Sequence, residues 1–267
     1  MPISDAQAEV LRAVAANRSP ESYLAGATVL LRGADTPRFS QDLDVFHDAA
    51  ESVARCAEQD AATLTAAGYE LSWLLRTPTF HRALLTVRDQ TLKIEWAQDS
   101  AFRFFPVVED ERCGYRLHEA DAAVNKVLAL AGRDEVRDFV DVLHLHRTYL
   151  SLGAMAWAAC GKDPGYTPEF LLDHLGRHAA YAQADVDRLN LRGPLDITVL
   201  KRSWLDALSD ARRLVTSLPP DEIGCLYLRP DHKPVTPDPA SDGFRSLIRH
   251  TGTVRGTWPS VEPSDAT

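Results

Sequence analysis

The segment Asp42-Leu43-Asp44-Val45 alternates polar and apolar side chains, which is the pattern of a β-strand with one buried face. On such a strand Asp42 and Asp44 project to the same side, whereas Leu43 and Val45 point to a core on the other side. Two carboxylates held side by side repel each other, so each is harder to ionise than it would be alone. A divalent cation removes this conflict, and Mg²⁺ prefers one or two carboxylates together with phosphate oxygens of a substrate. The segment therefore predicts either a metal-binding strand or an edge strand whose two aspartates are solvated.

A glycine turn precedes this strand. The short apolar stretch 23–25 stops at Gly26, and residues 28–32 favour a helix. A turn that opens a helix offers free backbone N–H groups to phosphate. The combination of glycine turn and paired aspartates favours the metal-binding interpretation.

A second alternating segment, Leu92-Lys93-Ile94-Glu95-Trp96, places Lys93 and Glu95 on one face of a strand. Metal-assisted nucleotidyl transfer requires a third carboxylate on a neighbouring strand. This carboxylate completes the metal site or takes the proton from the attacking hydroxyl. The alternative is a cross-strand surface ion pair, which contributes little to stability.

Two predicted helices after residue 118 carry a third group of charged side chains. Three of them are basic and can reach and neutralise a triphosphate: Lys126, Arg133 and Arg137. Asp138 and Asp141 are three residues apart and are therefore neighbours on one helical face. The same charges also fit an ordinary helix with ion pairs between neighbouring turns.

Strands dominate the centre of the first part of the chain, and helices dominate the second part. Helices are expected at residues 6–16 and 49–67, and strands at 69–75, 80–88 and 91–97, the last two joined at Asp89-Gln90. Further helices are expected at residues 120–130, 134–147, 155–159, 169–178, 184–189 and 198–217. The last 49 residues hold 8 of the 16 prolines and favour an irregular extension with short extended pieces such as 226–228.

Composition limits the class of protein further. The hydrophobic share of 45% and the charged share of 25% are ordinary for a globular protein. The net charge of −9 argues against a protein that coats nucleic acid, but it allows an enzyme with a local basic cleft. The four cysteines form no C-x-x-C pair, no apolar run is long enough to span a membrane, and the N-terminus does not have the features of a signal peptide. A cytoplasmic protein without membrane contact is expected.

Three segments together resemble the polymerase-β-like nucleotidyltransferase superfamily, and within it the AbiE/MenT-type nucleotidyltransferase toxins of bacterial toxin–antitoxin systems. They are residues 23–46 (Y-L-A-G-A-T-V-L-L-R-G … R-F-S-Q-D-L-D-V-F), 92–96 (L-K-I-E-W) and 121–145 (D-A-A-V-N-K-V-L-A-L-A-G-R … R-D-F-V-D-V-L-H-L). Each part alone is weak, whereas the combination is quite specific. The family's glycine turn continues with Gly or Ser, and Ala27 departs from it. Its methyl group leaves the backbone N–H intact but lacks a hydroxyl that could hold phosphate.

The resemblance implies an α+β fold with a polymerase-β-like nucleotidyltransferase core, built on a mixed sheet, at residues 1–118. A helical part, residues 119–218, closes the cleft, and a proline-rich extension follows at residues 219–267. It implies transfer of a nucleoside monophosphate from an NTP to an acceptor hydroxyl, with release of pyrophosphate. It also implies tRNA as the acceptor, blocked translation as the outcome and an antitoxin protein as a partner. In the family a Lys and an Asp of the third segment are catalytic, which indicates Lys126 and Asp141, with Asp138 as the competing choice.

The expected roles follow from these observations taken together. Asp42 and Asp44 bind Mg²⁺ or Mn²⁺, Glu95 is the third carboxylate or the base, and Lys126 steadies the triphosphate. The expected nucleotide-binding residues are Gly26, Ala27, Thr28, Arg38, Ser40, Lys93, Arg133 and Arg137. Two alternatives stay open: a nucleotidyltransferase that modifies a small molecule such as an aminoglycoside-like antibiotic, and a binding module whose catalytic site has decayed.

Overall fold

The computed structural model describes residues 3–30, 36–88, 90–133 and 135–254, except for the side chains of residues 178 and 179. Its first part is a seven-stranded sheet in the order β3-β4-β5-β2-β1-β8-β7. The bounds of these strands are β1 (Ser22–Ala25), β2 (Asp42–His47), β3 (Glu70–Thr77), β4 (Phe80–Val87), β5 (Gln90–Gln98), β7 (Val108–Asp110) and β8 (Gly114–Arg116). β2 is parallel to β5 and β1 to β8, whereas the other neighbours are antiparallel. This mixed sheet confirms the predicted fold class.

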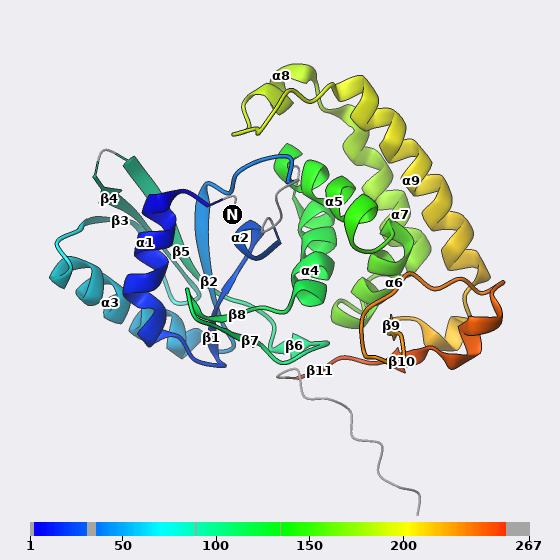
Figure 1. Cartoon of the computed structure of the whole chain (residues 1–267), viewed down its shortest axis with the longest axis horizontal. Coiled ribbons are helices and arrows are strands. Elements are labelled where there is room, and N and C mark those ends of the chain that lie inside the picture. The colour runs from blue at the N-terminus through cyan, green and yellow to red at the C-terminus, as the bar shows by residue number, and fades with distance from the viewer. Residues whose placement is uncertain (1–2, 31–35, 89, 134, 255–267) are drawn as a thin grey trace, which may run out of the picture.

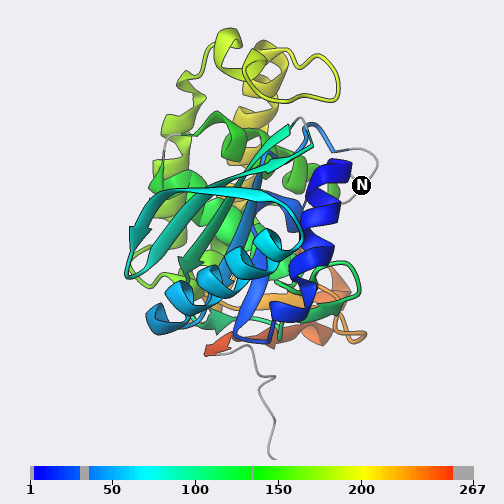
Figure 2. The ribbon, with the colours of Figure 1, turned by 90° about the vertical axis from the view of Figure 1, so that its left-hand side faces the viewer.

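Helices pack on both faces of the sheet (Figures 1 and 2). α1 (Asp5–Val14) and α3 (Ala50–Ala66) cover the apolar face, where Leu43 is fully buried. α2 (Ala27–Leu30) and α4 (Glu119–Gly132) lie on the opposite face. That opposite face carries the polar side chains of β2, so the alternation of the strand decides which side of the sheet faces the helical part.

The helical part packs around a second apolar core. Its helices after α4 are α5 (Val136–Thr148), α6 (Leu152–Lys162), α7 (Pro168–Leu175), α8 (Gln183–Asp187) and α9 (Ile197–Ser217). Phe139, Trp157 and Trp204 lie at the centre of this core and are at most 1% exposed. α4 joins the two cores, because Ala122 packs with the sheet and Val127 packs with the helices. The division of the chain into three parts stays a prediction.

The proline-rich segment contacts the rest of the molecule as far as residue 254. β9 (Leu226–Leu228), the predicted extended piece, is buried and pairs with β10 (Ile248–His250), and β11 (Thr253–Val254) pairs with β6 (Phe102–Arg103). The buried His250 ring bonds through Nε2 to the carbonyl of Phe104 at 2.5 Å. The described part of this segment is therefore packed against both the helical core and the stretch 102–104, which lies between β5 and β7 in the chain.

Most predicted elements agree with the structure to within a few residues. The helix predicted at 155–159 is longer, because α6 is buried nearly all round and its small apolar side chains leave no polar face to reveal its length. The strands β6 to β8 were not predicted, since two or three residues are too few to show alternation. Parts of three predicted elements lie outside the described residues: Asp89 of the hairpin, Asp134 at the start of a helix, and residues 31–32 at the end of another helix. Over the described ranges, every helix is too short or too polar to cross a bilayer.

Candidate active site

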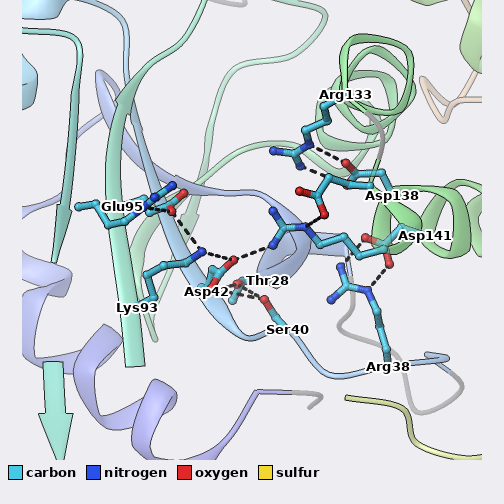
Figure 3. Close-up of polar contacts among 12 residues, drawn as sticks. Thr28, Arg38, Ser40, Asp42, Lys93, Glu95, Arg133, Asp138 and Asp141 are labelled. Carbon is cyan, nitrogen blue, oxygen red and sulfur yellow. Dashed lines mark hydrogen bonds and ion pairs between the residues drawn. The ribbon is translucent and has the colours of Figure 1, made fainter. Parts of the chain in front are cut away.

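Parallel pairing of β2 with β5 brings three carboxylates together on one face of the sheet. Asp42 lies opposite Lys93 in the register, and Asp44 lies opposite Glu95. All four side chains are half-buried, while the alternate residues of both strands are buried on the other face. Figure 3 shows Asp42, Lys93 and Glu95 side by side on this face. The predicted common face of each segment is confirmed.

Asp44 is held in an environment that opposes its charge. Burial, followed by the nearby charges of Glu95 and Asp42, raises the pKa of Asp44 from 3.8 to about 6. Lys126 and Arg137 act in the opposite direction but do not offset this effect. A divalent cation beside Asp44 would relieve the repulsion, so the chemistry of the donor set fits a metal ion of the kind that nucleotidyltransferases use.

Basic side chains hold the other two carboxylates in place. Arg137 donates from Nη1 to Asp42 Oδ2 at 2.8 Å, and Lys93 Nζ lies 3.1 Å from the same oxygen. Arg82 of β4 donates from Nε to Glu95 Oε1 at 2.7 Å. Among the described residues, no three acidic, histidine or cysteine side chains already form a metal-binding group. The printed ion pairs of Asp42 and Glu95 each use one carboxylate oxygen, Oδ2 and Oε1 respectively, and a metal ion would compete with these basic side chains for the two carboxylates.

Gly26 is the residue that makes room for Asp44. Its φ of +66° lies in the left-handed region, where a side chain is strained. A Cβ atom at this position would lie 1.9 Å from Asp44 Oδ2. The glycine turn at the end of β1 is thus a direct spatial requirement of the position of Asp44 on β2, in addition to its expected role beside phosphate.

Thr28 and Ser40 hold the start of β2. The Thr28 Oγ1 hydroxyl donates to the carbonyl of Asp42 at 3.0 Å, and the Ser40 hydroxyl lies 3.1 Å from the same oxygen. The two hydroxyl oxygens are 3.1 Å apart, and both side chains are buried. These contacts fix the backbone beneath Asp42.

A buried charge network connects the segment before β2 with α4 and α5 (Figure 3). Arg38 donates to both oxygens of Asp141, from Nε at 2.8 Å and from Nη2 at 2.6 Å. Lys126 Nζ lies 3.2 Å from Asp141 and 2.8 Å from Asp138, and Arg133 donates to Asp138 at 2.7 Å. Burial alone would raise the pKa of Asp138, but Lys126 and Arg133 outweigh it and lower this pKa to about 2. Both aspartates are fully buried and orient the cations around them.

Removing Arg38 is expected to destabilise the fold strongly. Arg38→Ala leaves the buried Asp141 with Lys126 as its charged partner, and breaking a buried pair on one side lowers the free energy of unfolding by about 3–5 kcal/mol. Urea denaturation measures this loss. Arg38→Met combined with Asp141→Leu should recover most of it, because no buried charge is then uncompensated. A double variant as unstable as Arg38→Ala would contradict this explanation.

The network and the carboxylates border a pocket of about 360 Å³ between the sheet and α4. The predicted site residues that line it are Gly26, Ala27, Arg38, Ser40, Asp42, Asp44, Glu95, Lys126, Arg133 and Arg137. Four predicted site residues do not line the pocket but contact residues that do: Thr28, Lys93, Asp138 and Asp141.

Sequence reasoning did not find several further residues of this site, among them Arg82, Phe46, Phe80, Asp99 and Asn125. The antiparallel register of β4 with β5 places Arg82 opposite Glu95. The predicted hairpin could have indicated this pair. Asp99 and Asn125 are 26 residues apart and gave no local signal.

Comparison with known structures defines the class of this fold. The chain is similar to MenT4, a nucleotidyltransferase toxin from Mycobacterium tuberculosis, with a TM-score of 0.58 and 16% identity over 81% of this chain and 83% of that chain. It is also similar to JHP933 from Helicobacter pylori, with a TM-score of 0.50 and 20% identity over 80% of this chain and 95% of that chain. The fold is therefore that of the polymerase-β-like nucleotidyltransferases, as predicted.

Comparison with family models identifies the particular group. The model described as nucleotidyl transferase AbiEii toxin, type IV toxin–antitoxin system, matches residues 9–217. The chain belongs to the AbiEii nucleotidyltransferase toxin family, which confirms the resemblance found in the sequence, and it is a nucleotidyltransferase. The search of curated proteins found no match. Membership implies an NTP substrate, a divalent metal and an antitoxin partner.

Proposed function

We propose that this protein transfers a nucleoside monophosphate from an NTP to a hydroxyl of tRNA, in the presence of Mg²⁺, and thereby blocks translation. The observation that supports this most directly is the register of β2 and β5, which sets Asp44 beside Glu95 in a pocket that Lys126 also lines. Carboxylates for a cation and basic groups for phosphate border one pocket, as phosphoryl-type transfer requires.

The proposed reaction assigns a task to each side of the pocket. Asp42 and Asp44 would hold the metal ion, which supplies charge neutralisation for the phosphates when bound. Lys126, Arg133 and Arg137 bind the triphosphate. The acceptor oxygen forms a bond to the α-phosphorus, the bond from that phosphorus to the bridging oxygen breaks, and pyrophosphate leaves. Glu95 accepts the proton of the acceptor hydroxyl.

tRNA is proposed as the acceptor because the chain belongs to a toxin family and its sequence resembles the AbiE/MenT toxins. Modified tRNA would be unable to support translation, and an antitoxin protein would counteract this effect. The competing acceptor is a cationic small molecule of the aminoglycoside type, which the acidity of the chain favours.

The test is incubation of the purified protein with Mg²⁺, total tRNA and each α-labelled NTP in turn, beside the double variant Asp42→Ala/Asp44→Ala. We expect label to enter tRNA with the unaltered protein and not with the variant. The labelled tRNA should then fail to support cell-free translation. Absence of label with every NTP would overturn the tRNA proposal. Label on an aminoglycoside panel and none on tRNA would establish the small-molecule alternative.

A further inference from the structure

The sheet continues beyond the catalytic carboxylates, and that part of its face has no role in the reaction described above. In the register, Glu95 of β5 lies opposite Arg82 of β4, and Arg82 lies opposite Leu75 of β3. Residues directly opposite each other on antiparallel strands point to the same side of the sheet. Arg82 and Leu75 therefore lie on the face of Glu95. Figure 1 shows β3 and β4 on the side of β2 that is away from α2 and α4.

We call this region the outer face, and it consists of Ser72 and Leu75 of β3 with Arg82 and Leu84 of β4. The outer face is accessible, because Leu75 is 44% exposed and the Arg82 side chain is 38% exposed. β3 is an edge strand, so the free edge of the sheet is two strand spacings from Glu95, roughly 10 Å. This width accommodates a single strand of nucleic acid and is too narrow for a duplex.

Arg82 is the charged side chain of the outer face, and part of its guanidinium group is available to a ligand. Arg82 donates from Nε to Glu95 Oε1 at 2.7 Å, and its guanidinium carbon lies 5.1 Å from the centre of the Phe80 ring. Within the described ranges of the chain, its two Nη atoms donate no hydrogen bond. A guanidinium group offers a planar fork of donors that matches phosphate oxygens. Arg82 is therefore suited to bind a phosphate group close to Glu95.

A β-bulge makes the edge of β3 a poor template for a strand of a partner protein. The pairing of β3 with β4 shifts between Trp73 and Leu75, which leaves Leu74 as an extra residue. A bulge twists an edge strand and interrupts the ladder that another strand would extend. Leu74 and Leu75 are nevertheless 54% and 44% exposed, so apolar surface lies next to Arg82. An apolar surface beside a cation can cover the flat side of a base while the cation holds the phosphate.

We infer that the outer face holds the RNA strand that carries the acceptor hydroxyl, with Arg82 bound to a phosphate of this strand and Leu75 packed against a base. The inference rests on the proposed nucleotidyl transfer, in which Glu95 takes the proton of that hydroxyl. The lining of the pocket between the sheet and α4 includes none of the four residues of the outer face, so an NTP in the pocket leaves this face free. A cationic small molecule would be repelled by Arg82, whereas the phosphates of RNA are attracted.

Equilibrium binding of fluorescently labelled total tRNA tests the inference, and NTP is omitted so that no transfer takes place. The affinity is measured at a series of salt concentrations. Arg82→Ala should weaken binding about tenfold and reduce the slope of log affinity against log salt concentration by about 0.7, the contribution of one phosphate contact in a single strand. Arg82→Lys should keep the slope of the unaltered protein, because the positive charge remains. If Arg82 only held Glu95 in place, Arg82→Ala would leave the slope unchanged.

Two matched controls separate the outer face from other exposed surface. Arg76→Ala removes the same group from the same hairpin, but Arg76 lies opposite His81 and pairs with Glu58 of α3 on the other face of the sheet. This variant should keep both the affinity and the slope. Leu75→Glu places a negative charge on the outer face and should weaken tRNA binding about tenfold. Leu205→Glu, at a residue of α9 that is 60% exposed, should bind tRNA as the unaltered protein does.

An unchanged salt slope in Arg82→Ala, or an equal loss of affinity in Arg76→Ala, would overturn the inference. Undiminished tRNA binding by Leu75→Glu would also overturn it and would assign the exposed leucines to a protein partner. Failure of the proposed function has a different signature. If label enters tRNA while the outer-face variants bind tRNA normally, nucleotidyl transfer is supported and the outer face is wrong. If these variants lose tRNA binding but no NTP labels tRNA, the outer face binds RNA and the proposed transfer is wrong.

Discussion

Asp44→Asn is expected to lower the rate of nucleotidyl transfer by about 10²–10³-fold, the effect of removing one preorganised electrostatic group. The substitution keeps the size of the side chain but removes the charge needed to hold a cation beside the substrate phosphates. It leaves the bonds of Thr28 and Ser40 to the carbonyl of Asp42 in place, because none of these three groups belongs to the Asp44 side chain. The measurement is single-turnover transfer of labelled nucleotide at saturating Mg²⁺.

The same substitution is expected to stabilise the protein when metal is removed. The fold raises the pKa of Asp44 from 3.8 to about 6, so the folded protein favours the protonated carboxyl. Above pH 6 the carboxyl is ionised, and its charge lowers the free energy of unfolding. A shift of this size corresponds to about 2–3 kcal/mol. The gain in stability from Asp44→Asn should be largest above pH 6 and should shrink as the pH falls toward 4, where the native carboxyl becomes protonated.

Thermal unfolding in EDTA at pH 7.5 and pH 4.5 measures this difference. Adding Mg²⁺ should stabilise the unaltered protein and leave Asp44→Asn unchanged, because a ligand stabilises only the state that binds it. Asp173→Asn, an exposed change, serves as the control at both pH values. If Asp44→Asn transfers nucleotide slowly but is no more stable than the unaltered protein at pH 7.5, then ionisation of Asp44 does not destabilise the fold. That result would contradict the expected gain in stability.

The fold was largely predictable because its main elements are long and strongly patterned. Alternation in β2 and β5 assigned the carboxylates to one face before any pairing was known, and the structure adds that the two strands are neighbours and parallel. That adjacency depends on the topology of the whole sheet, which local pattern does not specify. The short strands and the full length of α6 were missed because they have too few residues or no polar face.

The candidate site was predictable where charged residues occur in short, dense segments. Asp42, Asp44 and Glu95 border one pocket with Lys126 and the basic residues near it. The pocket residues Phe46 and Phe80 could not be found in this way, because they lie on two different strands and only the register of the sheet brings them to either side of Ala97.

Gly26→Ala is expected to abolish most of the activity through Asp44. The new Cβ would lie 1.9 Å from Asp44 Oδ2, so the carboxylate must move away from the position beside Glu95. The residue also keeps a φ of +66°, which costs a non-glycine residue about 1–2 kcal/mol. We expect a loss of at least about 10²-fold in transfer rate, comparable to removal of the carboxylate itself.

Gly68→Ala is the matched control, because it separates backbone strain from the clash. Gly68 has a φ of +88°, and a Cβ built there meets no atom of the described structure within 4 Å beyond its chain neighbours. Both variants should lose about 1–2 kcal/mol of stability from strain, measured by urea denaturation. Only Gly26→Ala should lose transfer activity, while Gly68→Ala should stay within about twofold of the native rate, since it leaves the carboxylate row untouched. Equal activity of the two variants would show that Asp44 can move without consequence, and the assignment of Gly26 as the residue that positions the catalytic strand would then be wrong.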